Sequence, residues 1–468
     1  MARKRGLDTL SQAAKEALLA GLRQPDRERA GAKAAAGDGQ RSRRDAARRQ
    51  SFTDLPGMAE LQTQKAVADL LGMANPFFRV HEGRAGAITS IDGRDCLNFA
   101  SYNYLGLNGH PAVNAAAKAA IDRYGTTVSA SRLVAGERPF HGELERRLAD
   151  FLGVDEAIAF VSGHATNVAA IGQLMSAKDL IVHDSLIHNS VLVGAELSGA
   201  TRRPFAHNDL DALDDLLDSS RHHHDRCLIV VEGLYSMDGD YPDLARLIEL
   251  RDRHEAWLMI DEAHSLGVLG ATGRGLAEES GIDPSAVDIW MGTLSKALSS
   301  CGGYIAGSAT LVDYLKFTAP GFVFSVGLPP PVATASIASL ELLIAEPDRV
   351  EKVRANGRLF LDLARRAGLD TGTSKGYAVV PVMVGDSVRA VYLSNRLLER
   401  GINALPIVHP AVPERAARLR FFITSEHEPE HIRTAVETTA DEIAKAAQSG
   451  FGLKTAAALA KAARQSSS

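Results

Sequence analysis

The sequence has little of what builds a disulfide framework, a zinc site or a membrane span. Its three cysteines, Cys96, Cys227 and Cys301, lie far apart and show no Cys-x-x-Cys spacing. This excludes a disulfide framework and a zinc site as expectations and favours a reducing cytoplasm. No run of about 18 uncharged apolar residues is present, so no transmembrane helix is predicted. The N-terminal residues also lack the apolar stretch of a secretion signal.

Two other ligand-binding patterns are missing. The glycine-rich residues 267–275 (GVLGATGRG) do not match Gly-x-Gly-x-x-Gly within a strand–helix–strand unit, so nicotinamide binding is not indicated. His222, His223 and His224 fall in a polar loop, which is typical of solvated side chains, and no metal site is predicted.

Charge is distributed unevenly along the 468 residues. The chain carries a formal net charge of -5, yet residues 1–50 hold 13 Lys and Arg against 6 Asp and Glu. The leader is therefore basic and the remainder mildly acidic. The body shows no basic patch of the kind that binds nucleic acid, so no nucleic-acid partner is expected.

The sequence predicts a leader followed by two folded domains. Apolar residues at helical spacing from Leu7 to Leu22 predict one short helix, and residues 23–49 have too few large apolar side chains to fold. We expect the following division: a leader at 1–50, an N-terminal arm and segment at 51–110, a large domain at 111–345, a small C-terminal domain at 346–451, and a tail at 452–468.

Short β-rich runs alternate with helix-length stretches from about residue 52 onward. This rhythm predicts an α/β fold with a large, mostly parallel sheet covered by helices on both faces, and a smaller C-terminal α/β domain. The helix expected between two of the runs spans Leu244–His254. The predicted strands are Ala157–Val161, Leu180–Val182, Cys227–Val231, Trp257–Ile260 and Ile289–Met291 in the large domain, and Ala378–Val384 and Leu419–Thr424 in the small one.

Lys296 stands just beyond the predicted strand Ile289–Met291, in the stretch GTLSK, and Gly302 and Gly303 follow it. Taken alone, such a lysine is most often an ordinary solvated charge in a turn. A lysine in a partly dry pocket, however, has a depressed pKa and can bond covalently to an aldehyde. Lys296 therefore raises the hypothesis of a pyridoxal phosphate site.

Other polar residues follow strands in the same way. Asp261 ends the run Trp257–Ile260, where a carboxylate could hold a pyridine nitrogen protonated, and His264 comes three residues later. Gly163 and His164 open an apolar helix after another strand, where backbone N–H groups favour a phosphate. Each signal alone has a structural explanation, such as a capping Asp or a common strand–Gly–helix turn. Their shared place at strand ends is what favours a site.

Taken in order, the stretches SGHATN, HDSLIHNS, EGLYSMDGDYPDL, IDEAHSLGVLG and GTLSKALSSCGGYIAG resemble those of the α-oxoamine synthases. The likeness runs from about Asn98 to about Ala435. It implies a pyridoxal phosphate enzyme of fold type I, a transferase that joins a small amino acid to an acyl thioester with loss of carbon dioxide. It also implies a homodimer with its sites at the subunit interface.

The resemblance assigns roles to matching positions. Lys296 resembles the lysine that holds the cofactor aldehyde, Asp261 the partner of the pyridine nitrogen, and His188 the histidine that stacks on the ring. Ser236 and His264 match residues that hydrogen-bond the ring oxygen. The remaining matches are Thr293, Gly163 and His164 as phosphate contacts, and Arg420 as the arginine that binds the substrate carboxylate, with Arg418 as the alternative.

Two positions depart from the family pattern. Where many relatives have Ser-Asn-Asp-Tyr-Leu-Gly, this chain has SYNYLG, so Asn103, the candidate contact for the substrate carboxylate, is displaced by one position. Near Val326 relatives often carry a hydroxyl that reaches the phosphate of the neighbouring subunit, and Ser325 is the candidate for this role here.

The stretches NFASYNYLGL and RLRFFIT look most like serine palmitoyltransferase-like enzymes and synthases associated with polyketide systems. The resemblance therefore implies serine, glycine or alanine as the amino acid and a long acyl chain carried on CoA or acyl carrier protein. An 8-amino-7-oxononanoate synthase of biotin synthesis is the alternative, and a pyridoxal phosphate aminotransferase is an alternative of another class. A carrier protein or anionic membrane surface is a hypothetical partner of the basic leader.

Overall fold

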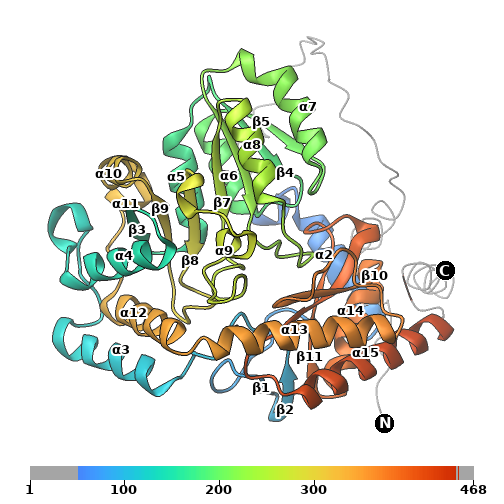
Figure 1. Ribbon diagram of the computed structural model, residues 1–468. Coiled ribbons are helices and arrows are strands. Elements are labelled where there is room, and N and C mark those ends of the chain that lie inside the picture. The colour runs from blue at the N-terminus through green and yellow to red at the C-terminus, as the bar shows by residue number, and fades with distance from the viewer. Residues whose placement is uncertain (1–50, 450–451, 453–468) are drawn as a thin grey trace, which may run out of the picture.

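The computed structural model describes residues 51–449 and residue 452, coloured in Figure 1. The predicted leader with its short helix, and the predicted tail apart from residue 452, lie outside the described residues. Within the described residues, no helix combines the length and apolarity needed to cross a bilayer.

A seven-stranded sheet forms the centre of the molecule. Five neighbouring strands run parallel, whereas β9 runs antiparallel to the strand on each side of it. The expected α/β fold with a mostly parallel sheet is confirmed. In spatial order the strands are β3 (Glu156–Phe160), β9 (Gly303–Gly307), β8 (Ile289–Thr293), β7 (Trp257–Asp261), β6 (Cys227–Glu232), β4 (Leu180–Asp184) and β5 (Thr201–Phe205).

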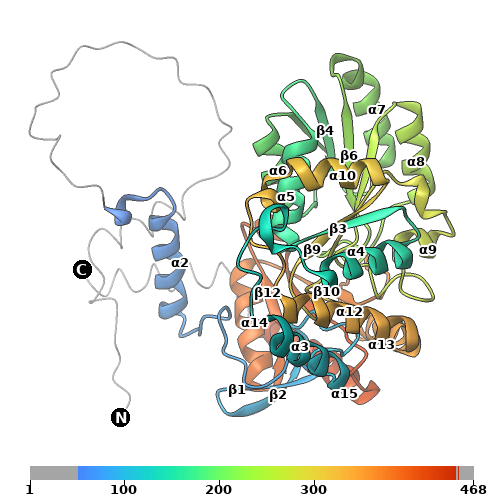
Figure 2. The same ribbon diagram turned by 90° about the vertical axis from the view of Figure 1, so that its left-hand side faces the viewer.

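Both faces of this sheet are buried, because side chains alternate between two cores. On β6, Leu228 and Val230 enter one core while Ile229 and Val231 enter the other. Figure 2 shows α5 and α6 on one side of the sheet and α7 and α8 on the other. The first core receives α5 (Gly163–Leu174), α6 (Asn189–Ser198) and α10 (Ala309–Thr318), and the second receives α4 (Pro139–Leu152), α7 (Leu210–Ser220), α8 (Leu244–Arg253) and α12 (Pro330–Ala345).

The sequence predicted five strands of this sheet and missed β5 and β9. β5 is an edge strand (TRRPF) with three exposed residues, so it lacks the apolar run of a buried strand. β9 (GYIAG) is fully buried but begins and ends in glycine, which has low strand propensity. The expected helix at Leu244–His254 is α8, which ends one residue earlier.

A second, three-stranded antiparallel sheet lies in the C-terminal part of the chain. Its strands are β10 (Val379–Gly385), β13 (Ala417–Phe422) and β12 (Leu405–Ile407), with β13 in the middle. β13 begins two residues before the predicted strand. The sheet shares a core with α13 (Asp348–Arg366), α14 (Ser387–Glu399) and α15 (Pro429–Ser449).

The N-terminal segment joins this C-terminal part. β1 (Ile88–Ile91) and β2 (Arg94–Asn98) form an antiparallel hairpin, and β2 pairs in parallel with β11 (Ile402–Asn403), which precedes β12. The domain limits drawn from the sequence stay a prediction. The remaining helices are α2 (Met58–Leu70), α3 (Pro111–Tyr124), α9 (Leu276–Ser280) and α11 (Pro320–Val323), with a π-helical turn at Arg132–Gly136 and short 3-10 turns at Phe52–Asp54, Arg221–His223, Pro284–Ala286 and Glu414–Ala416.

His207 joins two carboxylates beyond the carboxyl ends of the strands. Its Nδ1 lies 3.0 Å from Asp184 Oδ1 and its Nε2 lies 3.1 Å from Asp240 Oδ2. Thr373, in the segment between α13 and β10, donates to the same Asp240 oxygen at 2.7 Å. Burial alone would lower the pKa of His207, but hydrogen bonds to both carboxylates raise it to about 10. The charged imidazole therefore holds Asp240, and Asp240 connects the large sheet to the C-terminal part through Thr373.

His207→Gln should destabilise the fold most at low pH. The variant leaves two facing carboxylates without their cation, a loss on the order of 3 kcal/mol for a buried pair. Because the pKa is raised from an unfolded value of about 6.5, this contribution is complete below that pH and is lost as pH rises through about 10. Urea unfolding of wild type and variant from pH 6 to 10 measures the difference in free energy of unfolding. A difference that does not change with pH would contradict a charged His207 between the two carboxylates.

Candidate active site

Lys296 lies on a closed loop that follows β8. The loop is held by hydrogen bonds from Leu294 N to Gly302 O at 3.0 Å and from Ser299 N to Lys296 O at 3.0 Å. Gly302 has φ +134, and a Cβ there would lie 2.8 Å from Phe160 O. Only glycine closes this turn without strain, which explains the glycine that the sequence places after the lysine.

The amine of Lys296 is poorly solvated. Burial lowers its pKa to about 8, even though the negative charges of Asp261 and Glu232 act to raise it. The positive charge of Arg420 lowers it further. A substantial fraction of the amine is therefore neutral, and hence nucleophilic, near neutral pH.

Asp261 ends β7 beside Lys296's strand, and only 3% of its surface is exposed. Its Oδ2 accepts a hydrogen bond from Asn167 Nδ2 at 2.9 Å, and its Oδ1 accepts one from Ala263 N at 3.0 Å. Two donors stabilise the ionised form of a buried carboxylate. Asp261 is thus a fixed anion facing the cavity of Lys296.

His188 caps the start of α6. Its Nδ1 accepts from Ser190 N at 3.3 Å and lies 2.7 Å from Ser190 Oγ. Ser190 Oγ in turn accepts from Asn167 Nδ2 at 2.9 Å, which connects His188 to Asp261 through two side chains. Burial lowers the pKa of His188, so the ring is neutral at pH 7 with its proton on Nε2.

His264 is held by a tyrosine that the sequence did not single out. Tyr104 Oη lies 2.7 Å from His264 Nδ1. Burial raises the pKa of Tyr104 well above its usual value and lowers that of His264 well below its own. The tyrosine is therefore the donor, and the imidazole carries its proton on Nε2.

The N-terminus of α5 opens onto the same cavity. Ser162 caps the helix by accepting from Ala165 N at 3.4 Å. A Cβ at Gly163 would lie 2.9 Å from Thr293 Oγ1, so a larger residue would fill this space. The first N–H groups of a helix have no partner within it and favour an anion.

Arg420 and Arg418 lie on β13 but have different surroundings. Arg418 pairs with Asp238 at 2.7 Å. Arg420 donates to the backbone oxygen of Ser236 at 3.0 Å, and its Nε is buried without a partner. The donating Nη1 also lies 3.5 Å from Met237 Sδ, and among residues 51–449 no carboxylate forms an ion pair with Arg420. Arg420, rather than Arg418, is therefore available to bind an anion.

One cavity of about 80 Å³ brings together seven of the predicted residues. It is lined by Gly163, His164, Asn167, His188, Ser190, Glu232, Asp261, Ala263, His264, Met291, Thr293 and Lys296. Lys296 also lines a neighbouring cavity of about 330 Å³. The cavity offers an amine, a fixed carboxylate and a helix N-terminus, and buried unpartnered polar atoms remain on Asn167 and Glu232. This donor set fits pyridoxal phosphate.

The other predicted residues lie outside that cavity. Ser236 is buried on the loop after β6, between Glu232 and Arg420. Asn103 lines the larger neighbouring cavity, where it donates to Ala85 O at 2.9 Å and accepts from Ser299 Oγ at 3.1 Å. Asn103 therefore braces the lysine loop, and its contact with a substrate stays a prediction.

Ser325 lies at the surface of this chain. Its hydroxyl donates weakly to Val326 O at 3.3 Å, and the neighbouring Phe324 is 85% exposed. The structure does not bring Ser325 to the cavity of its own chain. Its predicted contact with the phosphate of a neighbouring subunit stays a prediction.

Four residues of the site were not identified from the sequence: Asn167, Ser190, Glu232 and Tyr104. Asn167 and Ser190 lie within the stretches SGHATN and HDSLIHNS, next to residues that were singled out. Glu232 directly follows the predicted strand Cys227–Val231 and is the last residue of β6. An acidic residue at the carboxyl end of a strand is the signal in the sequence that could have identified it.

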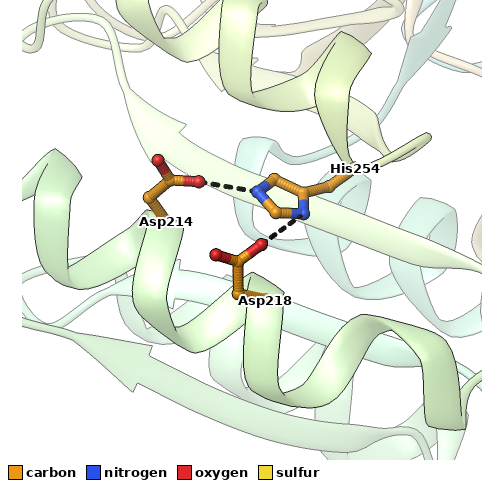
Figure 3. Close-up of side chains that lie close together, drawn as sticks. All are labelled: Asp214, Asp218 and His254. Atoms are coloured by element: carbon orange, nitrogen blue, oxygen red, sulfur yellow. Dashed lines mark hydrogen bonds and ion pairs between the residues drawn. The ribbon is translucent and has the colours of Figure 1, made fainter.

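A second group of ionisable side chains lies apart, between α7 and α8 (Figure 3). Ligand atoms of Asp214, Asp218 and His254 lie within 4.8 Å of one another. Asp214, however, already pairs with Arg246 at 3.3 Å and Arg253 at 2.5 Å. These guanidinium groups supply the positive charge that a cation would bring, so this group is an ion-pair network.

Comparison with known proteins identifies relatives along most of the chain. Residues 94–438 match the family described as aminotransferase class I and II. The 8-amino-7-oxononanoate synthase of Pelobacter propionicus is 44% identical over 361 residues, covering 77% of this chain and 92% of the relative. The 8-amino-7-oxononanoate synthase 1 of Bacillus velezensis is 38% identical over 356 residues, covering 76% and 90%.

Solved structures overlap the fold closely. The serine palmitoyltransferase of Sphingomonas wittichii superposes with a TM-score of 0.80 at 28% identity, covering 84% of this chain and 98% of that one. A serine palmitoyltransferase with pyridoxal phosphate as internal aldimine gives the same values. The 8-amino-7-oxononanoate synthase of Francisella tularensis has a TM-score of 0.66 at 26% identity, covering 75% and 98%.

The depressed pKa of Lys296 should be measurable without any substrate. In the apoenzyme, the acetylation rate of Lys296 should rise with a midpoint near pH 8, because only the neutral amine reacts. Asp261→Asn removes an anion that raises this pKa, so the midpoint should move to lower pH. Peptide mass spectrometry from pH 6 to 11 measures both, and a midpoint at the value of a solvated lysine would contradict the dry site.

Proposed function

The chain belongs to the α-oxoamine synthases, the pyridoxal phosphate-dependent acyltransferases of fold type I, and we propose that it acts as an 8-amino-7-oxononanoate synthase. The arrangement that carries this proposal is the nucleophilic amine of Lys296 in one cavity with the anion Asp261. The finer choice among oxoamine synthases is supported by relatives of that name at 38% and 44% identity.

The product name defines the two substrates chemically. In 8-amino-7-oxononanoate, carbon 8 bears the amine and a terminal methyl group, which is what alanine leaves after losing its carboxyl group. Carbons 1 to 7 form an acyl unit that ends in a free carboxylate. We therefore propose alanine and a heptanedioyl thioester as substrates.

Pyridoxal phosphate, when bound, supplies an electron sink that stabilises negative charge at the amino acid Cα. Lys296 would hold the cofactor at its aldehyde through the neutral amine. The same amine would serve as the base for the Cα proton of the amino acid. Burial supports both roles, because it lowers the pKa of the amine to about 8 and so leaves part of it unprotonated near pH 7.

The surrounding residues hold the ring. Asp261 would supply the negative charge for the pyridine nitrogen, and Asn167 orients that carboxylate. His188, a neutral imidazole, would pack on the ring, and His264 would donate its Nε2 proton to the ring oxygen. The N-terminus of α5 with Gly163 would hold the phosphate.

Arg420 binds the carboxylate of the incoming amino acid. Its buried, unpartnered Nε gives the guanidinium a free edge for a bidentate pair. Such a pair would restrict the amino acid to one orientation, which would present its Cα proton to Lys296. Arg420 would therefore contribute to the reaction by orienting the substrate, without taking part in bond making.

Serine palmitoyltransferase activity is the second candidate. The TM-score of 0.80 with that enzyme favours it, and it was the first expectation from the sequence. The curated relatives support the 8-amino-7-oxononanoate synthase instead, so the order of the two is reversed.

A homodimer is part of the proposal. Phe324 and Val326 beside Ser325 are 85% and 48% exposed, and a second copy would cover this apolar segment. The molecular mass of the protein in solution tests whether it is a dimer. The proposed contact of the leader with a carrier protein or lipid concerns residues 1–50, which lie outside the described residues.

A panel of substrates should separate the candidates. With a heptanedioyl thioester, kcat/KM for alanine should exceed that for glycine or serine by about tenfold. This is the usual discrimination for substrates that differ by one small group, such as a methyl or a hydroxyl. Each donor is offered on CoA and on acyl carrier protein, and released thiol and amino ketone are measured. Lys296→Ala is the control and should give neither product. Preference for serine with palmitoyl-CoA would establish the second candidate, and amino transfer without thiol release would contradict both.

The two arginines of β13 should behave differently when truncated. Arg420→Ala should raise KM for the amino acid by about 10- to 100-fold, because a charge-assisted pair is lost. Arg418→Ala leaves Asp238 unpaired and should lower the free energy of unfolding instead. Steady-state kinetics and urea unfolding of both variants test this, and equal effects on KM would mean that the carboxylate site is assigned to the wrong residue.

A further inference from the structure

Glu232 is a second carboxyl group at the cavity that the proposed reaction does not use. It is the last residue of β6, paired in register with Asp261 on β7. The two side chains are 2% and 3% exposed, and both line the cavity of Lys296. Ionising both carboxyl groups of such a pair, on neighbouring strands and in one dry cavity, is costly, so one of them keeps a proton.

Hydrogen bonds decide which carboxyl group keeps it. Asp261 accepts from two donors, Asn167 Nδ2 and Ala263 N. Glu232 accepts from one, Ser236 N at 2.9 Å to Oε2, and its Oε1 is buried with no partner. Donors stabilise the charged form, so the ionised member of the pair is Asp261 and the proton stays on Glu232.

The charges around Glu232 agree with this assignment. Burial, and next the anion Asp261, raise the pKa of Glu232 to about 8, while the Ser236 N–H and Lys296 lower it. Asp184 on β4 raises it as well. The other ionisable groups that face it are Arg420 on β13, Tyr104 on the segment before α3, and Tyr235 on the loop after β6.

We propose that Glu232 is a neutral carboxylic acid in the working enzyme and donates a hydrogen bond from Oε1 to an acceptor atom of the bound pyridoxal phosphate. The proposal rests on the cofactor occupying the cavity of Lys296. Oε2 is already used by Ser236 N, which leaves Oε1 as the atom that can carry the proton toward the cavity. The cavity then contains one fixed anion rather than two, and Lys296 is not held protonated by a second carboxylate.

Three variants of the purified apoenzyme test the donor. Glu232→Gln is neutral and keeps a donor, so its Kd for pyridoxal phosphate at pH 7 should stay within about threefold of wild type. Glu232→Leu has no donor and should bind about tenfold more weakly or worse. Glu262→Gln is the matched control. Burial also raises the pKa of Glu262, to about 7, but its Oε1 accepts from Leu276 N away from the cavity.

The pH dependence supplies a second readout. Above pH 8 the wild-type carboxyl ionises, loses its donor and adds a negative charge beside Asp261. Wild-type affinity for the cofactor should therefore fall more than that of Glu232→Gln between pH 7 and 9.5. Comparison with the variant removes the effect of Lys296, which titrates in both proteins. In wild-type protein labelled with ¹³C at the glutamate carboxyls, the resonance missing from Glu232→Gln should have the shift of a protonated acid at pH 7.

Several results would overturn the proposal. They are an ionised Glu232 at pH 7, equal weakening in Glu232→Gln and Glu232→Leu, weakening of the same size in Glu262→Gln, or an effect confined to binding of the amino acid. These outcomes are separate from the proposed function, because the carboxyl resonance is read in the apoenzyme. A wrong amino acid or acyl group would leave all of them unchanged.

Discussion

A lysine amine and an aspartate share one dry cavity, and the rest of the site depends on their balance of charge. Burial pushes the pKa of Lys296 down, Asp261 pushes it back up, and the result is a value of about 8. β7 and β8 set this balance, because neighbouring parallel strands end at the same edge of the sheet. A sheet buried on both faces keeps that edge rigid and poorly solvated.

The same edge is closed by the C-terminal part of the chain. On the loop after β6, the backbone oxygen of Ser236 accepts from Arg420, and Asp238 pairs with Arg418. These two contacts hold β13 against the loop beside the cavity. Asp240, which is paired with His207, adds a third connection because it accepts a hydrogen bond from Thr373. The two arginines are two residues apart on β13 and therefore lie on the same face of the strand, where both contact the loop after β6.

Periodicity was enough to predict the alternating strands and helices, because a parallel sheet buried on both faces leaves continuous apolar runs in the chain. Periodicity did not predict β5, because three of its five residues are exposed. It also did not predict β9, because the glycines at both ends of this short buried strand have low strand propensity. The order of the short motifs indicated the family, and seven of the predicted residues line one cavity. Ser325 and Asn103 show the limit, since motif position alone does not say what a side chain contacts.

The sequence by itself determined the fold class, the lysine, the aspartate and the family, because these depend on the order of residue types along strands and at their ends. Only the tertiary structure decided that Arg418 pairs with Asp238 while the Arg420 Nε has no partner, that Tyr104 orients His264, and that a second carboxyl group, Glu232, lies in register with Asp261. The physical reason is that charge, protonation and hydrogen bonding depend on burial and on neighbours brought together from distant segments, and no local pattern encodes them.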